Sequence, residues 1–290
     1  MPMEPTKNSS PAVSAERIAH YYNANTSHFL RLGGSGNTAA IHRAIWAPGV
    51  INKDQAFAYL NALVADAVQP LLGAAPGNVH LLDLGCGVGG TSTWLAQALG
   101  IKVTGISLSA AQVEIARERA QTLGLTQQVD FVLGDFTALP EMAPAQAACA
   151  IESFVHANNT GAFFTMAAQQ IQPGGRLVIC DDFLNPPHSA SALKWIGRFV
   201  RGWHLNNLQP VDEVLQHAEL AGFRLLEAHD LSPYVRSFPT PLLWSVTTLT
   251  KLPVPWAYWH NLSGGSALQV CLRRGWTKYW ALVWERQQSD

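Results

Sequence analysis

Charged residues are scarce in this sequence, and the net charge is close to zero. Only 13% of the 290 residues are Asp, Glu, Lys or Arg, and the formal net charge is −1. Proteins that bind the phosphate backbone of nucleic acids normally carry an excess of Lys and Arg. The composition therefore gives no reason to expect a nucleic-acid partner. The 48% of hydrophobic residues indicates a globular chain with a sizeable core.

The chain also lacks long apolar runs and cysteine motifs. No stretch of about 18 uninterrupted apolar residues occurs, so we expect no membrane-spanning helix. The first residues, MPMEPTKNSSPAVSAER, contain no apolar core of a secretory signal. We therefore expect a disordered tail over residues 1–14 and a cytoplasmic protein. The four cysteines show no metal-site spacing and are expected to be reduced: Cys86, Cys149, Cys180 and Cys271.

Between residues 80 and 183, short apolar segments alternate with segments of helical period. The apolar segments predict five buried strands: HLLDLGC (80–86), KVTGISLS (102–109), VDFVLGD (129–135), AACAIES (147–153) and RLVICDDF (176–183). The last helical segment among them, GAFFTMAAQQIQPGG (161–175), is expected to end at Pro173 and two glycines. This alternation predicts an α/β fold with a mostly parallel sheet and helices on both faces.

The regions on either side of this α/β pattern have a different character. Residues 15–75 are helical, apart from the loop LGGSGNTAA (32–40), and are expected to form an N-terminal lid. Residues 76–187 would be the α/β core. Residues 188–290 hold eight of the ten tryptophans, and we expect a substrate cap there together with the last strands, including TKYWALVWER (277–286).

A glycine-rich loop follows the first predicted strand. LLDLGCGVGG (81–90) has the spacing D-x-G-x-G-x-G and opens a predicted helix. Glycines there let the backbone approach a ligand at a helix N-terminus. A dinucleotide site would also need an acid about 20 residues further on, and the second strand ends at Ile106–Ser107 without one. For the loop alone, a tight turn that binds no ligand remains the alternative.

Three motifs in order resemble the class I S-adenosylmethionine-dependent methyltransferases. They are LLDLGCGVGG, GDF (134–136) and IQPGGRLVI (171–179), and they cover roughly residues 80–182. The resemblance implies a Rossmann-like fold with a seven-stranded sheet and S-adenosylmethionine as cofactor. It places Gly85, Gly87 and Gly89 along the amino-acid end of the cofactor. Asp83 would stabilise the loop or reach the cofactor's ammonium group through water.

The adenine and ribose ends of the cofactor are assigned by two of these resemblances. Asp135 would accept from the adenine amine, and Phe136 would pack on the ring or serve as plain core. GISLSAAQ (105–112) resembles GITLSxxQ in the sterol, tocopherol and cyclopropane fatty acid methyltransferases. There the serine or threonine and the glutamine replace the usual ribose carboxylate, which implies that Ser107 and Gln112 contact the cofactor. Ordinary helix capping by Ser107 or Ser109 is the alternative.

The N-terminal segment resembles the lid of the same subgroup. In HYYNANTSHFLRL (20–32), Tyr22-Asn23 stands where the subgroup has Tyr-Asp, and Phe29 fills the later aromatic position. The resemblance implies that Tyr22 covers the sulfonium end of the cofactor, although Tyr21 fits if the register shifts by one. HRAIWAPG (42–49) is similar to the subgroup's H-x-G-x-W stretch, with Trp46 near the methionine tail or packing a lid helix.

CAIESFVHAN (149–158) resembles the strand-four signature A-I-E-A-T-x-H-A of sterol C-methyltransferases. Glu152 and His156 hold the Glu and His positions. The resemblance implies that Glu152 faces the reacting centre or organises the methyl-donor end. His156 would accept a proton or orient Glu152. The alternatives are a buried glutamate tied to the backbone or to an N-terminal arginine, and a hydrogen-bonded structural histidine.

The aromatic residues of the cap could line an apolar substrate chamber or simply form its core. Lys194, Arg198 and Arg201 would share one helix face, which could hold a diphosphate or be solvated. Asp181 and Asp182 follow the fifth strand, where Asp182 could contact substrate or a diphosphate-bound cation. No metal-ligand spacing occurs, and Mg²⁺ would be needed only with a diphosphate. The predicted substrate residues are Trp46, Trp195, Arg198, Trp203, Tyr234, Trp244 and Trp259.

Methyl transfer to carbon and to a heteroatom make different demands on these residues. An alkene carbon that accepts a methyl group becomes a carbocation, which a carboxylate, aromatic faces and a dry cavity can stabilise. We therefore expect C-methylation of an olefinic isoprenoid, with a prenyl diphosphate as one candidate. The alternatives are an O- or N-methyltransferase of a small specialised metabolite, with His156 as base, and a non-catalytic cofactor-binding protein. The sequence does not indicate an oligomeric state.

Overall fold

The computed structural model describes residues 13–32, 41–73, 76–139, 143–252, 254 and 257–288, with the backbone alone for residues 27–32 and 257. Residues 1–12, most of the predicted tail, and 33–40 of the predicted loop lie outside the described residues. The described strands form one seven-stranded sheet in the order β3-β2-β1-β4-β5-β7-β6. They are β1 (His80–Leu84), β2 (Lys102–Ser107), β3 (Val129–Leu133), β4 (Ala145–Ile151), β5 (Ile171–Leu184), β6 (Phe223–Asp230) and β7 (Thr277–Arg286).

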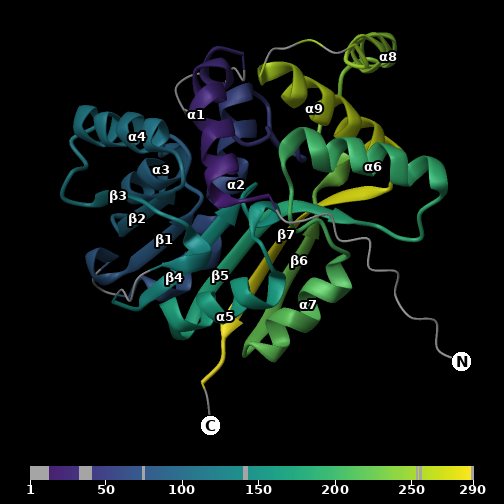
Figure 1. Cartoon of the computed structure of the whole chain (residues 1–290). Helices are drawn as coiled ribbons and strands as arrows, with labels where there is room; N and C mark the ends of the chain where they lie inside the picture. The colour runs from purple at the N-terminus through teal and green to yellow at the C-terminus, as the bar shows by residue number, and fades with distance from the viewer. Residues whose placement is uncertain are drawn as a thin grey trace, which may run out of the picture.

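Helices lie on both faces of this sheet and above one edge (Figure 1). Their bounds are α1 (Ala15–Leu32), α2 (Lys53–Val68), α3 (Gly90–Leu99), α4 (Ala110–Thr122), α5 (Thr160–Gln170), α6 (Ala190–Trp203), α7 (Val211–Leu220), α8 (Thr240–Leu249) and α9 (Ala257–Arg273). The predicted α/β architecture with a mostly parallel seven-stranded sheet is confirmed. Residues 41–52, expected to be helical, contain no helix, and one helix boundary was also wrong. Helix α5 ends at Gln170, before Pro173, because Ile171 is buried and already pairs with Ala145 of β4.

Strands β1 to β5 pair in parallel, whereas β7 runs antiparallel to both β5 and β6. The carboxyl ends of the parallel strands therefore meet at one edge of the sheet. Helices α1, α6 and α9 lie over that edge (Figure 1). In open α/β sheets this is the edge at which ligands bind.

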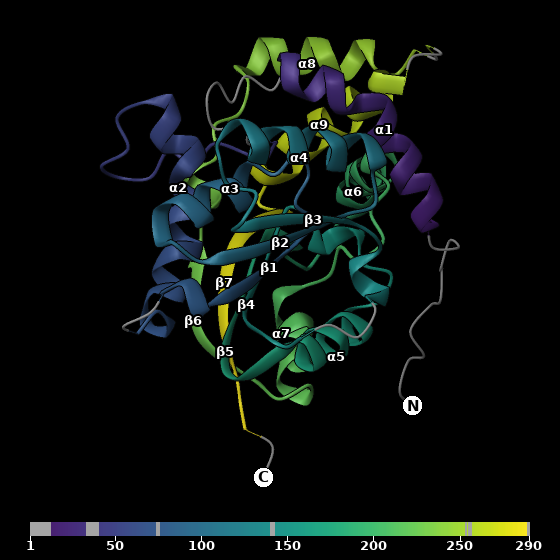
Figure 2. The same cartoon turned by 90° about the vertical axis from the view of Figure 1, so that its left-hand side faces the viewer.

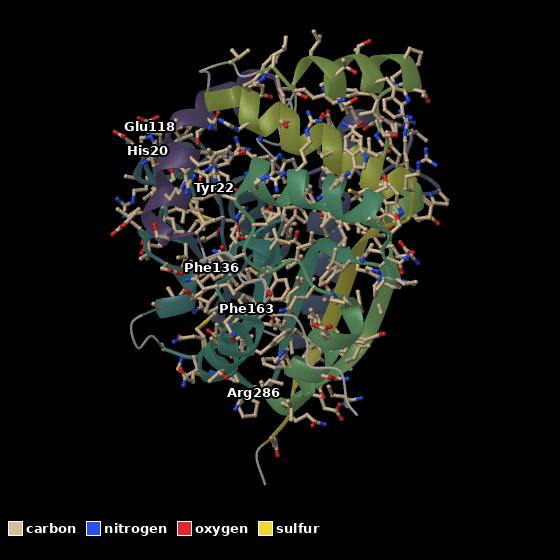
Figure 3. The ribbon with its side chains drawn as sticks, turned by 45° about the vertical axis from the view of Figure 1, so that its right-hand side comes forward. His20, Tyr22, Glu118, Phe136, Phe163 and Arg286 are labelled. Carbon is tan, nitrogen blue, oxygen red and sulfur yellow. The ribbon has the colours of Figure 1, made fainter. Side chains whose placement is uncertain are left out.

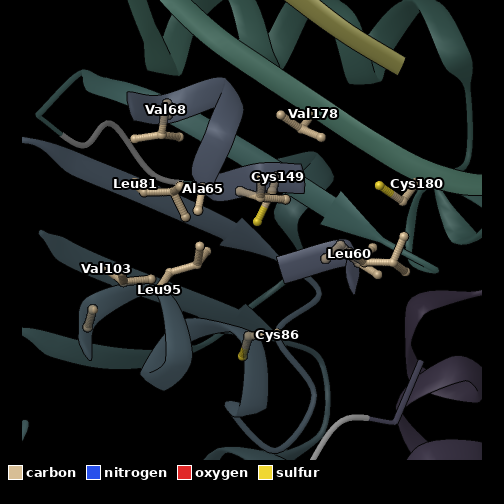
Figure 4. Close-up of a cluster of buried hydrophobic side chains, with 14 of the residues drawn as sticks. Leu60, Ala65, Val68, Leu81, Cys86, Leu95, Val103, Cys149, Val178 and Cys180 are labelled. Atoms are coloured by element: carbon tan, nitrogen blue, oxygen red, sulfur yellow. The ribbon is translucent and has the colours of Figure 1, made fainter. Parts of the chain in front are cut away.

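The two faces of the sheet are covered by different helices, and each face has its own apolar cluster (Figure 2). On one face Leu60 of α2 and Leu95 of α3 pack against β1, β4 and β5 (Figure 4). On the other face Phe163 of α5 and Val214 of α7 are fully buried. All four cysteines are free and buried, as the sequence predicted, and three of them lie in the first cluster.

Helices α6, α8 and α9 form a cap outside the sheet, and α8 is its outermost helix (Figures 1 and 2). The backbones of α6 and α9 cross closely at Gly202 and Gly264. A Cβ atom on Gly202 would lie 2.5 Å from the Cα of Gly264. Trp203, the last residue of α6, lies against Gly264, where a Cβ atom would be 2.5 Å from Trp203 Cδ1.

Gly89 stands before α3, with φ at 76°. A Cβ atom there would lie 2.5 Å from Phe131 Cζ. Left-handed backbone costs an L-residue roughly 1–2 kcal/mol, and crowding adds about 1–3 kcal/mol. We therefore expect Gly89→Ala to lower the free energy of unfolding by about 2–5 kcal/mol in urea titrations. Gly124 has φ 68° and open space around its Cα, so Gly124→Ala is the matched control and should lose only about 1–2 kcal/mol. Equal losses would show that Phe131 moves aside.

Candidate active site

A cavity of about 260 Å³ lies where the carboxyl ends of the parallel strands meet α1, α6 and α9. Side chains predicted from three separate parts of the sequence meet at this cavity. In Figure 3, Tyr22 of α1 lies above Phe136, so lid and core approach each other here. The predicted site residues that line the cavity are Tyr22, Asp83, Gly85, Gly87, Ser107, Gln112, Phe136, Glu152, His156 and Trp203.

The wall at the end of β2 is polar. Ser107 Oγ donates to Gln112 Oε1 at 2.8 Å, and both side chains are buried. Ser109, not Ser107, caps α4 by accepting from the Gln112 backbone N–H. Ser109 Oγ also donates to Asn23 Oδ1 at 2.6 Å, which ties α1 to α4. Ser109 is therefore the N-cap of α4, while Ser107 and Gln112 line the cavity.

Asp83 is the last polar side chain of β1 and is 2% exposed. Ser92 Oγ of α3 donates to Asp83 Oδ2 at 2.6 Å, which links the strand to the helix that follows the glycine loop. Burial raises the pKa of Asp83 to about 6, although the hydrogen bond from Ser92 opposes the shift. Asp83 thus braces the loop and also reaches the cavity.

Glu152 follows β4 directly and has φ at 52°, a backbone conformation that non-glycine residues rarely adopt. Its Oε1 accepts from the backbone N–H of Arg43 at 2.9 Å, from Arg43 Nε at 3.0 Å and from Tyr279 Oη at 3.0 Å. Burial would raise the pKa of Glu152, but the Arg43 guanidinium and His42 hold it below its ordinary value. The N-terminal arginine foreseen as an alternative is therefore present, and Glu152 lines the cavity as well.

His156 and Tyr22 form a hydrogen-bonded pair at the lid side of the cavity. The distance from Tyr22 Oη to His156 Nε2 is 2.8 Å, and His156 Nδ1 lies 3.4 Å from the His204 carbonyl oxygen. A carbonyl can only accept, so Nδ1 carries the proton and Nε2 accepts from Tyr22. Burial lowers the pKa of His156 to about 4. The imidazole is therefore neutral at physiological pH.

Two predicted cofactor residues lie beside the cavity wall. Gly89 is the residue before α3, and a Cβ atom on it would lie 2.5 Å from Phe131 Cζ and 3.0 Å from Ala116 Cβ. Asp135 Oδ1 accepts from the backbone N–H and the Oγ1 of Thr137, at 2.8 and 2.7 Å, and caps the short helix Phe136–Ala138. Neither is among the lining residues described. Their contacts with a cofactor stay predictions.

Of the seven predicted substrate residues, Trp203 alone lies among the cavity-lining residues that are described. Arg198 donates to Ser263 Oγ at 2.8 Å, to the Thr247 carbonyl at 3.1 Å and to Thr250, so its guanidinium joins α6 to α8 and α9. Substrate roles away from the cavity remain predictions.

The other aromatic side chains pack elsewhere in the cap or beside it. The Arg236 guanidinium stacks 3.4 Å from the Trp46 ring centroid, and the Trp46 backbone N–H donates to the Tyr234 carbonyl. Trp195 meets Trp244, which is 52% exposed, edge to face. Trp259 Nε1 donates to the Leu252 carbonyl. The side chain of Phe29, the later aromatic position of the predicted lid segment, lies outside the described residues.

Several functional positions had no assignment from the sequence. Arg43 and Tyr279 hold Glu152, and Asn261 of α9 lines the cavity beside Trp203. Asp181 was expected to follow the fifth strand, but it lies within β5, where it pairs with Trp280, and it lines the cavity at 1% exposure. Arg43 follows the first residue of the H-x-G-x-W-like stretch, which is the one local signal that pointed to it.

Comparisons with known proteins agree with this geometry. A family model described as a methyltransferase domain matches residues 81–175. Methyltransferase GfsG of Streptomyces halstedii is 34% identical over 157 residues, covering 54% of this chain and 56% of that protein. O-methyltransferase rstn1 of Aspergillus nomiae is 30% identical over 153 residues, which cover 52% of this chain and 67% of that protein. The chain belongs to the class I S-adenosylmethionine-dependent methyltransferases.

This methyltransferase also resembles proteins named for C-methylation. 24-methylenesterol C-methyltransferase 2 of Oryza sativa subsp. japonica is 32% identical over 205 residues, 68% of this chain and 53% of that protein. The chain spans little more than half the length of the first relatives it matches, 56% and 60%. The [4+2]-cyclase SpnF has a TM-score of 0.75 at 24% identity, covering 96% and 99% of the two chains. A structure of geranyl diphosphate methyltransferase has a TM-score of 0.71 at 24% identity, and the match covers 94% of this chain and 99% of that chain.

The cavity fits S-adenosylmethionine chemically. Its lining combines apolar Val88, Leu108 and Phe136 with the polar Ser107–Gln112 pair and the carboxylate of Glu152. A flat adenine, a hydroxylated ribose and a cationic sulfonium would each find a matching surface. Among the described residues, no cluster of three His, Cys, Asp or Glu is arranged for a metal ion. No helix in the described part of the chain is long and apolar enough to cross a membrane.

Proposed function

We propose that the chain transfers a methyl group from S-adenosylmethionine to an unsaturated carbon of a hydrophobic small molecule, an olefinic isoprenoid. The observation that carries the proposal is the pairing, in one cavity, of an ionised Glu152 with a neutral, weakly basic His156. The cofactor, when bound, supplies the methyl group as an electrophile. A new carbon–carbon bond forms while the carbon–sulfur bond breaks, which leaves a carbocation on the substrate.

The residues of the chain then serve this carbocation. The Glu152 carboxylate stabilises positive charge, first on the sulfonium and then on the substrate carbon. Tyr22 and Trp203 present aromatic groups to the same cavity, and aromatic faces attract cations. The proton whose loss forms the new double bond passes to Tyr22 Oη as Tyr22 gives its own proton to His156 Nε2, and the His204 carbonyl holds the His156 ring in place.

The weak basicity of His156 favours carbon over oxygen as the methylated atom. A carbocation loses its neighbouring proton to a very weak base. An alcohol or phenol retains its proton unless the base has a pKa near the working pH. A pKa of about 4 for His156 suits the first task and is poor for the second. The sterol C-methyltransferase relative and the geranyl diphosphate methyltransferase neighbour support the same reading.

The pH profile tests this assignment. We expect kcat/KM to fall in two steps, the first near pH 6, where Asp83 beside the glycine loop becomes protonated, and the second as the pH approaches 4, where His156 becomes protonated and can no longer accept. An unshifted histidine would give a decline near about 6.5. Circular dichroism at each pH separates titration from unfolding. His156→Gln should lower kcat, keep the decline near pH 6 and lose the decline near pH 4; loss of the decline near pH 6 instead would contradict the assignment.

A second candidate function is O-methylation of a small specialised metabolite. It is favoured by relatives named O-methyltransferases, including one that is 33% identical over 165 residues. In that reaction His156 would take the hydroxyl proton, and bound cofactor and substrate would have to raise its pKa. N-methylation of an amine makes the same demand.

A substrate panel with methyl-labelled S-adenosylmethionine decides between these functions. We expect label in geranyl or farnesyl derivatives, tested as alcohols and as diphosphates, with and without Mg²⁺. Among the described cavity-lining residues there is no Lys or Arg, so the alcohols and diphosphates are separate arms. Label only in phenols or amines would establish the second candidate. Calorimetry with S-adenosylhomocysteine accompanies the panel, and absence of binding would overturn both.

A further inference from the structure

Arg43 joins two carboxylates and an aromatic ring from distant parts of the chain. Its Nε donates to Glu152 Oε1 at 3.0 Å, and its Nη1 donates to Asp182 Oδ1 at 3.0 Å. Its Nη2 donates to Asp182 Oδ2. The guanidinium lies 4.2 Å from the centroid of the Tyr279 ring, and Tyr279 Oη donates to Glu152 Oε1 as well. Arg43 comes from the segment 41–52, between the lid helix α1 and helix α2.

These contacts divide the two oxygens of Glu152 between different tasks. Oε1 accepts three hydrogen bonds, two of them from Arg43, and these are the described contacts of the carboxylate. Oε2 is the oxygen left for a ligand, and Glu152 lines the cavity. A backbone φ of 52° at Glu152 shows that its surroundings enforce this orientation.

The charges in this group do not cancel. The Asp182 carboxylate accepts from both Nη1 and Nη2 of Arg43, which is the bidentate geometry that makes such ion pairs strong. Asp182 is 1% exposed. The positive charge of Arg43 is thereby matched by Asp182, which is not among the cavity-lining residues. Glu152 contributes a second negative charge, and that charge faces the cavity.

We propose that Arg43 is a positioning residue for the cofactor: it keeps Glu152 ionised, with Oε2 toward the cavity, so that the site prefers the cationic sulfonium to the neutral thioether product. The inference rests on the proposed function, because it concerns the same cavity and cofactor. Because Arg43 belongs to the segment 41–52, the negative charge at the cavity depends on the contacts of this segment with Glu152 and Asp182. Product release would then follow from the loss of the sulfonium's charge.

The preference can be measured without turnover, as the ratio of dissociation constants for S-adenosylhomocysteine and S-adenosylmethionine by calorimetry. In the wild type we expect S-adenosylmethionine to bind about ten-fold more tightly, with little change from pH 6 to 9. In Arg43→Met, His42 remains but the larger opposing charge is gone, so burial raises the pKa of Glu152. The ratio should fall toward one at pH 6, where Glu152 is protonated, and recover toward pH 9, where it ionises.

Other titratable groups surround Glu152 and require a control. They are Tyr22 of α1, His42 of the segment 41–52, Cys180, Asp181 and Asp182 of β5, and Tyr279 of β7. The double variant Arg43→Met, Glu152→Gln keeps all of these groups. Its ratio should stay near one at every pH, which assigns the recovery in Arg43→Met to Glu152.

Each outcome decides something. If the wild type binds neither ligand, the proposed function falls and this inference with it. If the wild type binds both but Arg43→Met keeps the wild-type ratio at pH 6, Arg43 has no positioning role, and the proposed function stands. Arg43→Met leaves Asp182 unpaired and could unfold the chain. In that case the double variant Arg43→Met, Asp182→Leu replaces it, because both charges are removed. The ratio of dissociation constants should recover with pH in the double variant as well. A merely structural arginine would lower both affinities together and leave the ratio unchanged.

Discussion

Glu152→Gln is expected to lower kcat by about 10²–10³-fold, the usual effect of removing one charge-stabilising group from an active site. Glutamine has the shape of glutamate, so its Oε1 can still accept from Arg43 and Tyr279. What is lost is the negative charge that faces the sulfonium and the carbocation. The affinity for S-adenosylhomocysteine, which carries no sulfonium, should change by less than about three-fold, since that ligand has no charge for Glu152 to stabilise.

Single-turnover rates with labelled cofactor measure the first effect, and calorimetry measures the second. The matched control is Glu227→Gln, which makes the same chemical change on β6, where the side chain is 59% exposed and pairs with His229. That variant should be indistinguishable from the wild type. If Glu152→Gln kept most of its rate, the carbocation role of Glu152 would be wrong, and its charge would serve binding alone.

Asp182→Leu is expected to lower the free energy of unfolding by about 3–5 kcal/mol. Breaking a buried ion pair from one side leaves the other charge without a partner, which costs more than the pair contributed. Asp182 is 1% exposed, and the Arg43 side chain is 17% exposed. Glu152 would still hold Arg43 through Oε1, but the two Nη groups would face the apolar leucine.

The double variant separates this cost from a loss of packing. Arg43→Met, Asp182→Leu removes both charges and leaves no unpaired guanidinium, so it should recover at least about 2 kcal/mol relative to Asp182→Leu. Urea titrations of the wild type, both single variants and the double variant complete the cycle. If the two single losses simply added in the double variant, the ion pair would not be the source of the effect.

The sequence predicted the parallel part of the sheet well because its signals are local. Each of β1 to β4 is a short apolar run bounded by glycine or a polar turn, and the helices between them have a clear period. The start of β5 was missed. Its residues 171–175 contain Pro and two glycines, which read as a loop, and pairing with Ala145 was needed to make them a strand.

Motif residues close to the ligand-binding edge lie together at the cavity, and their roles stay predictions, whereas the direction of the cap side chains could not be predicted. Gly85 and Gly87 of the glycine loop, Ser107, Gln112, Glu152 and His156 line the cavity. The abundance of tryptophan in the cap could not tell Trp203, which lines the cavity, from Trp244, which is 52% exposed. Arg43 is separated from Glu152 and Asp182 by 109 and 139 residues, and no local pattern carries such a contact.

The cap helices α8 and α9 are inserted into a β-hairpin. Strand β6 ends at Asp230 and β7 begins at Thr277, while Asp230 pairs with Trp280 across the hairpin. The two ends of the insertion, residues 231–276, therefore leave and re-enter the sheet side by side. We therefore expect that a relative's cap can be joined at these two points without shifting the register of β6 and β7. The incoming α9 must bring a glycine to face Gly202, because α6 approaches Gly264 too closely for any side chain. Chimeras built at these junctions would test whether substrate choice depends on the cap, with the sheet edge left unchanged.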